Sequence, residues 1–139
     1  MRLKIVFQLY HAVLVLALAG TVTELGLLGH FEDPWQWAPI VVLTLCLSLT
    51  LTHFFAPRPL IRKLFRISMI LCVLTGITGL FLHLKGNFEF ELEMYKNLSF
   101  FSLLWRSLRG ALPALAPGSM IYIGLLGLIT ALIQPPVSR

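Results

Sequence analysis

The sequence predicts an all-α integral membrane protein: a four-transmembrane-helix bundle with N-in/C-in orientation and an amphipathic helix at the outer membrane interface. Composition is the first reason, because 58% of the 139 residues are hydrophobic and 12% are charged, whereas a soluble domain carries about 25% charged residues. Four apolar stretches, residues 6–28, 38–55, 67–84 and 118–133, approach the ~20 residues that a crossing helix needs. The basic residues also gather in segments that this topology places on one side. One membrane domain, residues 1–139, follows.

The first stretch, residues 6–28, has two possible interpretations. It begins as a secretory signal does, with basic residues, an apolar run and Ala17–Ala19 as a cleavage site. However, Tyr10 and His11 interrupt the run, and hydrophobicity continues to residue 28. A retained first helix is therefore favoured over a cleaved signal.

Glu24 is the ionisable residue inside this first helix. An ionised side chain at membrane depth costs roughly 2.5–3.5 kcal/mol at the helix centre and usually faces the interior of a bundle. Gly20 and Glu24 are four residues apart and share one helical face. We therefore expect Glu24 to turn toward other helices.

The second span, residues 38–55, follows a short acidic loop with Trp35 and Trp37, which are typical of the aromatic belt at headgroup level. Leucine alternates here with threonine, cysteine and serine, as in a strand. A lone strand in lipid would leave its backbone groups unpaired. A helix is therefore predicted.

The third span, residues 67–84, has a stripe of small residues that ends in an ionisable one. Gly76, Gly79 and His83 share a face that lets another helix approach closely. Gly20 and Glu24 offer a similar face on the first helix. We expect the first and third helices to pack together through these residues at their outer halves.

Residues 85–117 form the long outer segment. Apolar and acidic residues alternate over 88–94, and this period of two predicts an extended chain. Residues 98–112 have the pattern of an amphipathic helix lying in the interface plane. The fourth span, residues 118–133, carries Gly124 and Gly127 as its small, helix-packing stripe.

The charge distribution predicts the orientation. With the N-terminus inside, the cytoplasmic side holds seven basic residues and no acid: Arg2, Lys4, Arg58, Arg62, Lys63, Arg66 and Arg139. All acids except Glu24 lie on the opposite side, so the positive-inside rule gives N-in/C-in. This is interpreted as an orientation signal and not as a nucleic-acid-binding patch. We expect a multi-pass protein of the bacterial cytoplasmic (inner) membrane.

The outer pole is the candidate functional site. His30 and His83 close their spans at the outer boundary, Glu24 lies about 9 Å below His30 along the helix, and Glu89 follows His83 by six residues. Protonated imidazoles would favour charged Glu24, whereas desolvation would favour its neutral form. Such a cluster could relay protons, bind an ion or metal, or be a static hydrogen-bond cluster, and the static cluster is favoured.

The other histidines allow a second hypothesis. His11 and His53 lie toward the cytoplasmic ends of the first two helices, as His30 and His83 lie at outer ends. Two histidines at one level could ligate a haem or a transition metal. Interfacial or hydrogen-bonded imidazoles are the simpler interpretation.

No nucleophile–base spacing, phosphate loop or nucleic-acid motif is present, and Cys46 and Cys72 are interpreted as free core thiols. We expect no enzyme activity and no cofactor. The favoured function is an accessory or assembly subunit whose outer segment 85–117 contacts a membrane-protein partner or a second copy. The alternative is a small proton- or ion-coupled transporter that uses Glu24, and a histidine-ligated haem or metal protein is less favoured.

Overall fold

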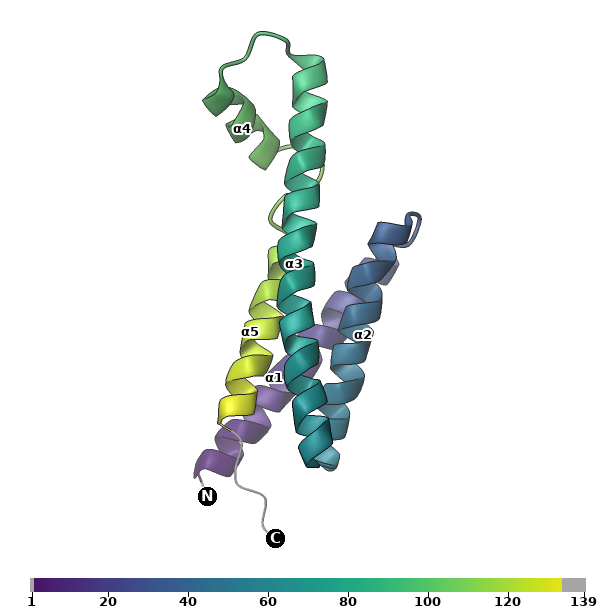
Figure 1. Ribbon diagram of the computed structural model, residues 1–139, viewed down its shortest axis with the longest axis vertical. Helices are drawn as coiled ribbons and strands as arrows, with labels where there is room; N and C mark the ends of the chain where they lie inside the picture. The colour runs from purple at the N-terminus through teal and green to yellow at the C-terminus, as the bar shows by residue number, and fades with distance from the viewer. Residues whose placement is uncertain (1, 134–139) are drawn as a thin grey trace.

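The structure is a computed structural model that describes residues 2–133, and 82% of these residues are helical, with no strands among them. Five helices follow in order (Figure 1): α1 (Arg2–Leu27), α2 (Pro34–Phe55), α3 (Pro59–Met94), α4 (Phe100–Leu108) and α5 (Gly118–Leu132). Arg139, one of the orienting basic residues, lies outside the described residues. The prediction of an all-α chain is confirmed for the described part.

Three helices, α1, α2 and α3, are long and apolar enough to cross a membrane. α5 is also apolar, but its 15 residues are fewer than a crossing helix usually has. This fold is compatible with a membrane-embedded protein.

Four of the helices form a ring in which each contacts two neighbours. α1 packs on α2, α2 on α3, α3 on α5, and α5 back on α1. Successive members of the ring run in opposite directions, so the start of α1 and the end of α5 lie at one end of the bundle (Figure 1). α1 and α3 therefore lie at opposite corners, and the predicted close packing of the first and third helices is wrong.

Gly76 and Gly79 of α3 instead face α5 and its N-cap residue Pro117, where the two chain segments approach closely. A Cβ atom on Gly76 would lie 2.9 Å from Ile121 Cγ1, and one on Gly79 would lie 2.9 Å from Pro117 Cβ. On α5, a Cβ atom on Gly124 would lie 2.7 Å from the Met69 carbonyl oxygen. Small residues allow this approach, and close packing is a main source of helix association in a bilayer.

Leucine, cysteine, methionine and other apolar side chains fill the centre of the ring. The buried core comprises Leu14, Leu18, Leu43, Cys46, Phe65, Met69, Cys72, Met120, Ile123 and Ala131. Large apolar side chains such as Leu16, Val41 and Leu74 cover the outward faces of the same helices. Apolar residues both inside and outside are what a lipid-facing bundle requires.

α3 is much longer than the predicted span of residues 67–84. Its 36 residues extend about 54 Å at 1.5 Å per residue, whereas the hydrocarbon core is about 30 Å thick. It begins at Pro59, a residue suited to the first helical position. At its other end it continues as a helix to Met94, so the predicted extended chain over 88–94 is wrong.

The projecting end of α3 carries α4 at its side (Figure 1). Ser99 caps α4 by accepting a hydrogen bond from the Ser102 backbone N–H at 3.3 Å. The helix covers 100–108 and is shorter than the predicted 98–112. We call residues 81–112, which comprise the end of α3, α4 and the chain around them, the projecting hairpin.

Candidate functional site

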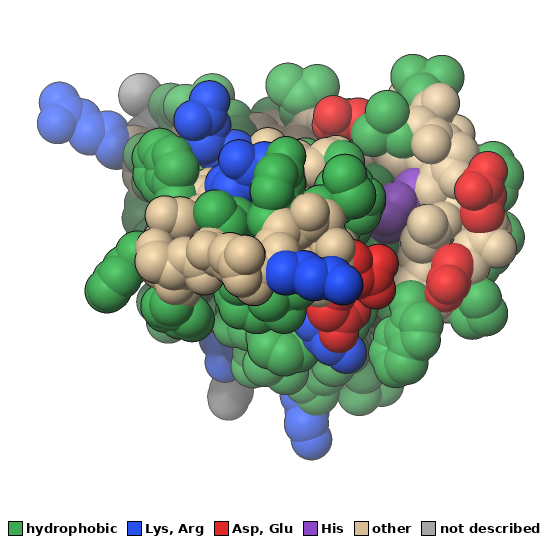
Figure 2. All heavy atoms as spheres, turned by 90° about the horizontal axis from the view of Figure 1, so that it is seen from above, with side chains coloured by type: hydrophobic (Ala, Val, Ile, Leu, Met, Phe, Trp, Pro, Cys, Tyr) green, Lys and Arg blue, Asp and Glu red, His purple; other side chains and the backbone are tan. Residues whose placement is uncertain are grey.

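The structure brings His30 and His83 together at the outer pole. Their ring centroids are 6.4 Å apart, and His83 Nδ1 lies 3.2 Å from the Pro113 carbonyl oxygen. His30 reaches this position through a turn in which Gly29 adopts a φ of 66°, a conformation that glycine permits. From above, histidine is visible among acidic and apolar side chains (Figure 2).

Partial burial, together with the nearby His83, lowers the pKa of His30. His30 is therefore favoured in its neutral form, which is the form that ligates metals. Within residues 2–133, however, no three histidine, cysteine or acidic side chains are arranged to hold a metal ion.

The two predicted acids do not join these histidines. Glu24 is exposed on α1, and no hydrogen bond or ion pair links it to His30 or His83. Glu89 is also exposed and forms an ion pair with Lys85, with 3.6 Å between the charged atoms. The expectation that Glu24 turns toward other helices is wrong, because its side chain is exposed, whereas Leu14 and Leu18 are the residues that α1 contributes to the buried core.

A second histidine pair lies inside the bundle at the opposite end. His11 Nε2 is 3.1 Å from His53 Nδ1, and both side chains are almost fully buried. His11 Nδ1 is 3.1 Å from the Phe7 carbonyl oxygen, and the Phe65 ring stacks on His53 with centroids 4.5 Å apart. If His11 Nδ1–H donates to the carbonyl, His11 Nε2 is left to accept from His53 Nδ1–H.

Breaking this pair from one side is expected to be costly. His53→Leu would leave His11 Nε2 buried without its donor, which lowers the free energy of unfolding by about 1–3 kcal/mol. The His11→Leu/His53→Leu double variant removes both partners and should lose less than the sum of the single changes. Thermal unfolding in detergent micelles, followed by circular dichroism, measures the three variants. Additive losses would show that the imidazoles do not interact.

A buried polar network fastens α4 to α3. Asn87 Nδ2 donates to the carbonyl oxygens of Ser107 at 2.9 Å and Leu112 at 2.7 Å, and the Leu112 N–H donates to Asn87 Oδ1 at 3.0 Å. Arg106 Nε donates to Glu91 Oε2 at 2.6 Å, and this bond raises the pKa of Arg106. The sequence did not predict that Asn87 and Glu91 hold α4, although their i,i+4 spacing places both on one helical face.

Because this polar side of α4 faces α3, much of its apolar side faces outward. Phe101 is 81% exposed and Trp105 is 60% exposed, and Phe100 is exposed as well. On α3, Phe90 and Met94 are also exposed beyond the ring of helices. The projecting hairpin thus displays an apolar surface that the described chain leaves uncovered.

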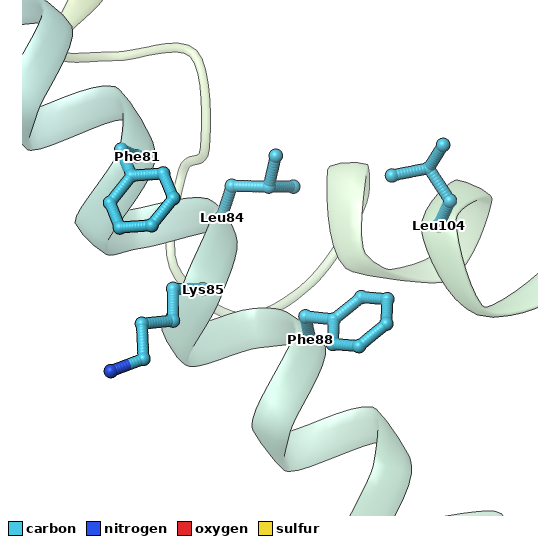
Figure 3. A pocket seen from close by; sticks show the side chains of 5 residues that line it. All are labelled: Phe81, Leu84, Lys85, Phe88 and Leu104. Carbon is cyan, nitrogen blue, oxygen red and sulfur yellow. The ribbon is translucent and has the colours of Figure 1, made fainter. Parts of the chain in front are cut away.

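A cleft of about 230 Å³ separates α3 from α4 within this hairpin. It is lined by Phe81, Leu84, Lys85, Phe88 and Leu104. Figure 3 shows Leu84 and Leu104 directed toward one another across the cleft, while the amino group of Lys85 points away from it. The cleft is therefore apolar and continues the exposed apolar surface.

Comparisons with family models, curated proteins and solved structures gave no match to this chain. Function is therefore inferred from the chain's own geometry. The histidine pair of the outer pole lacks the two predicted acids, whereas the projecting hairpin has an ordered internal network and an uncovered apolar face. The projecting hairpin is therefore the stronger candidate for a functional surface.

Proposed function

We propose that this protein is a non-enzymatic accessory or assembly subunit of a membrane-protein complex. It spans a bacterial inner membrane four times, with both termini on the cytoplasmic side, and its projecting hairpin binds a partner subunit on the outer side. The uncovered apolar face of the hairpin carries this proposal.

The path of the chain into α5 supports a fourth span. α5 itself, with 15 residues, accounts for roughly 22 Å at 1.5 Å per residue. Ahead of it, the N–H groups of Ala116 and Gly118 bond to the carbonyls three residues earlier, at 3.0 Å each. Such i→i+3 turns rise about 2 Å per residue. Together the two parts approach the ~30 Å of a hydrocarbon core.

The length of α3 places the apolar surface of the hairpin outside the hydrocarbon core. Phe90 lies about 30 residues beyond Pro59 on one continuous helix, which corresponds to roughly 46 Å of length. A bilayer is about 40–45 Å thick with its headgroups. If α3 crosses from Pro59, its last turns and α4 stand beyond the hydrocarbon core, at or above the level of the outer headgroups.

The uncovered apolar area is large for a surface left in water. An aromatic side chain presents about 150–250 Å², and Phe90, Phe100, Phe101 and Trp105 are each more than half exposed. These four contribute roughly 400–600 Å², as much as the largest apolar patches of ordinary monomers, which are often functional. Aromatic residues are also enriched at protein interfaces. An apolar surface of a neighbouring subunit is the occupant that fits.

The test is a Phe101→Ser/Trp105→Ser double variant. We expect at least a tenfold lower yield of the partner that crosslinks to the hairpin in native membranes, quantified by mass spectrometry. The matched control is Glu93→Ser, which alters an exposed charged residue of the same hairpin and should leave the yield unchanged.

Unchanged crosslinking in the double variant, with helicity retained, would contradict the proposal. Crosslinks only between identical chains would make a second copy the occupant. If the protein were a monomer that transports an ion in liposomes, and if Glu24→Gln abolished this transport, the transporter alternative would replace the proposal.

A further inference from the structure

The end of the bundle at which α1 and α3 begin carries only positive charge among the described residues. Its basic residues are Arg2, Lys4, Arg58, Arg62, Lys63 and Arg66. The six acids of the chain lie elsewhere, and the two ion pairs found in residues 2–133 are both in the projecting hairpin. The first turn of α3 contains no acid. These cations therefore have no acidic partner in the part of the chain that the structure describes.

Arg62 is a second indication that this end of the bundle binds a ligand. Its Nε atom is buried and has no hydrogen-bond partner in the described part of the chain. A buried donor of a charged group without an acceptor is unfavourable, and such exceptions call for an explanation. Arg58, Lys63 and Arg66 surround it in sequence and are exposed. Arg62 as a whole is only partly buried, so a negatively charged ligand could bind its guanidinium group and balance the surrounding cations together.

The position of Arg62 indicates which acceptor reaches it. α2 ends at Phe55 and α3 begins at Pro59, so the first turns of α3 lie at one end of two apolar helices that are long enough to cross a membrane (Figure 1). If these two helices cross a bilayer, their ends lie near the lipid phosphates, and guanidinium groups bind phosphate through paired hydrogen bonds. Clusters of four to eight basic residues beside a membrane-spanning helix favour anionic lipids.

We propose that this end of the bundle is a binding site for the phosphate of an anionic phospholipid. Arg62 is the central ligand, and Arg58, Lys63 and Arg66 supply the surrounding positive charge. The site depends on neither the partner nor the orientation given under the proposed function, so either inference can fail without the other.

The experiment uses the full chain in detergent micelles. Phosphatidylglycerol and phosphatidylcholine with identical acyl chains are added in turn, and inorganic phosphate forms a third arm; bound molecules are counted by native mass spectrometry. We expect phosphatidylglycerol to bind at least fivefold more tightly than phosphatidylcholine. Arg62→Gln should weaken phosphatidylglycerol binding about fivefold, which is the contribution of one basic residue at an anionic surface.

Two further variants keep the proposal falsifiable if Arg62→Gln does not fold. Arg62→Lys keeps the charge but lacks the guanidinium, so its binding should lie between those of the wild type and Arg62→Gln. Arg66→Gln changes an exposed residue and should weaken binding, whereas Arg109→Gln, in the projecting hairpin, should not. Equal binding of the two lipids, or equal losses in Arg66→Gln and Arg109→Gln, would overturn the proposal. Inorganic phosphate that displaces phosphatidylglycerol at equal concentration would overturn the lipid assignment.

Discussion

Gly124→Ala is expected to lower the free energy of unfolding by about 1–3 kcal/mol, which is the usual cost of inserting a methyl group into a filled interface. The new Cβ atom would lie 2.6 Å from Val73 Cγ2, 2.7 Å from the Met69 carbonyl oxygen and 3.0 Å from the Val73 backbone nitrogen. Two of these atoms belong to the α3 backbone. The clash is therefore relieved only when α3 and α5 move apart, which also loosens their other contacts.

Two other glycines provide matched controls. At Gly127 the three atoms nearest to a new Cβ all belong to the side chain of Met69 and none to a backbone, so a change of the Met69 rotamer can relieve the clash and Gly127→Ala should cost less. At Gly20 no atom lies within 4 Å. Gly20→Ala should be neutral or stabilising by up to about 1 kcal/mol, because alanine favours helix.

Thermal unfolding in one detergent, followed by the helical signal in circular dichroism, compares the three variants. The expected order of stability is Gly20→Ala, then Gly127→Ala, then Gly124→Ala. A Gly124→Ala variant as stable as Gly20→Ala would show that α3 and α5 do not pack in this register.

These glycines show what the sequence could and could not predict about the fold. Spacing alone identifies a small-residue face on each of three helices, because residues three and four apart share a face. It does not identify which faces meet. Gly76 and Gly124 lie in the α3–α5 interface, whereas Gly20 faces open space, and helix order around the ring decided between them.

The candidate site shows the same limit. The sequence predicts how far along its helix each residue lies, so His30 and His83 could be expected at the same end of the bundle. The structure places them together. Rotation of a helix about its axis is decided by all of its neighbours at once. Glu24 could therefore lie near their end of the bundle and still be exposed, with no hydrogen bond or ion pair to either ring among the described residues.

The projecting hairpin was the hardest part to predict. Alternating apolar and acidic residues over 88–94 have the period of a strand, yet glutamate, leucine and methionine are also good helix formers. Arg106 pairs with Glu91 from 15 residues further along the chain, and Asn87 pairs with backbone groups of Ser107 and Leu112. Contacts at such separations leave no local pattern in the sequence.

Asn87→Ala is expected to release α4 from α3. The substitution removes three hydrogen bonds and leaves the carbonyl of Ser107 and both backbone groups of Leu112 without these partners. At about 0.5–1.5 kcal/mol per bond, the local loss is roughly 1.5–4.5 kcal/mol. The ion pair between Arg106 and Glu91 is partly exposed and contributes too little to hold the helix alone.

The change should be local, because α4 contacts only α3 among the other helices. Hydrogen–deuterium exchange of the amides in 100–108 should therefore accelerate by a factor of ten or more, while α1, α2 and α5 keep their protection. Asn97→Ala, at an exposed position of the same hairpin, is the matched control and should change neither. Asn87 is buried and cannot contact a partner directly. Its substitution should nevertheless lower the yield of the crosslinked partner, because α4 would no longer hold Phe101 and Trp105 in position. Unchanged protection of α4 in Asn87→Ala would show that the polar network does not hold the helix, and that its apolar face is not presented in a fixed position.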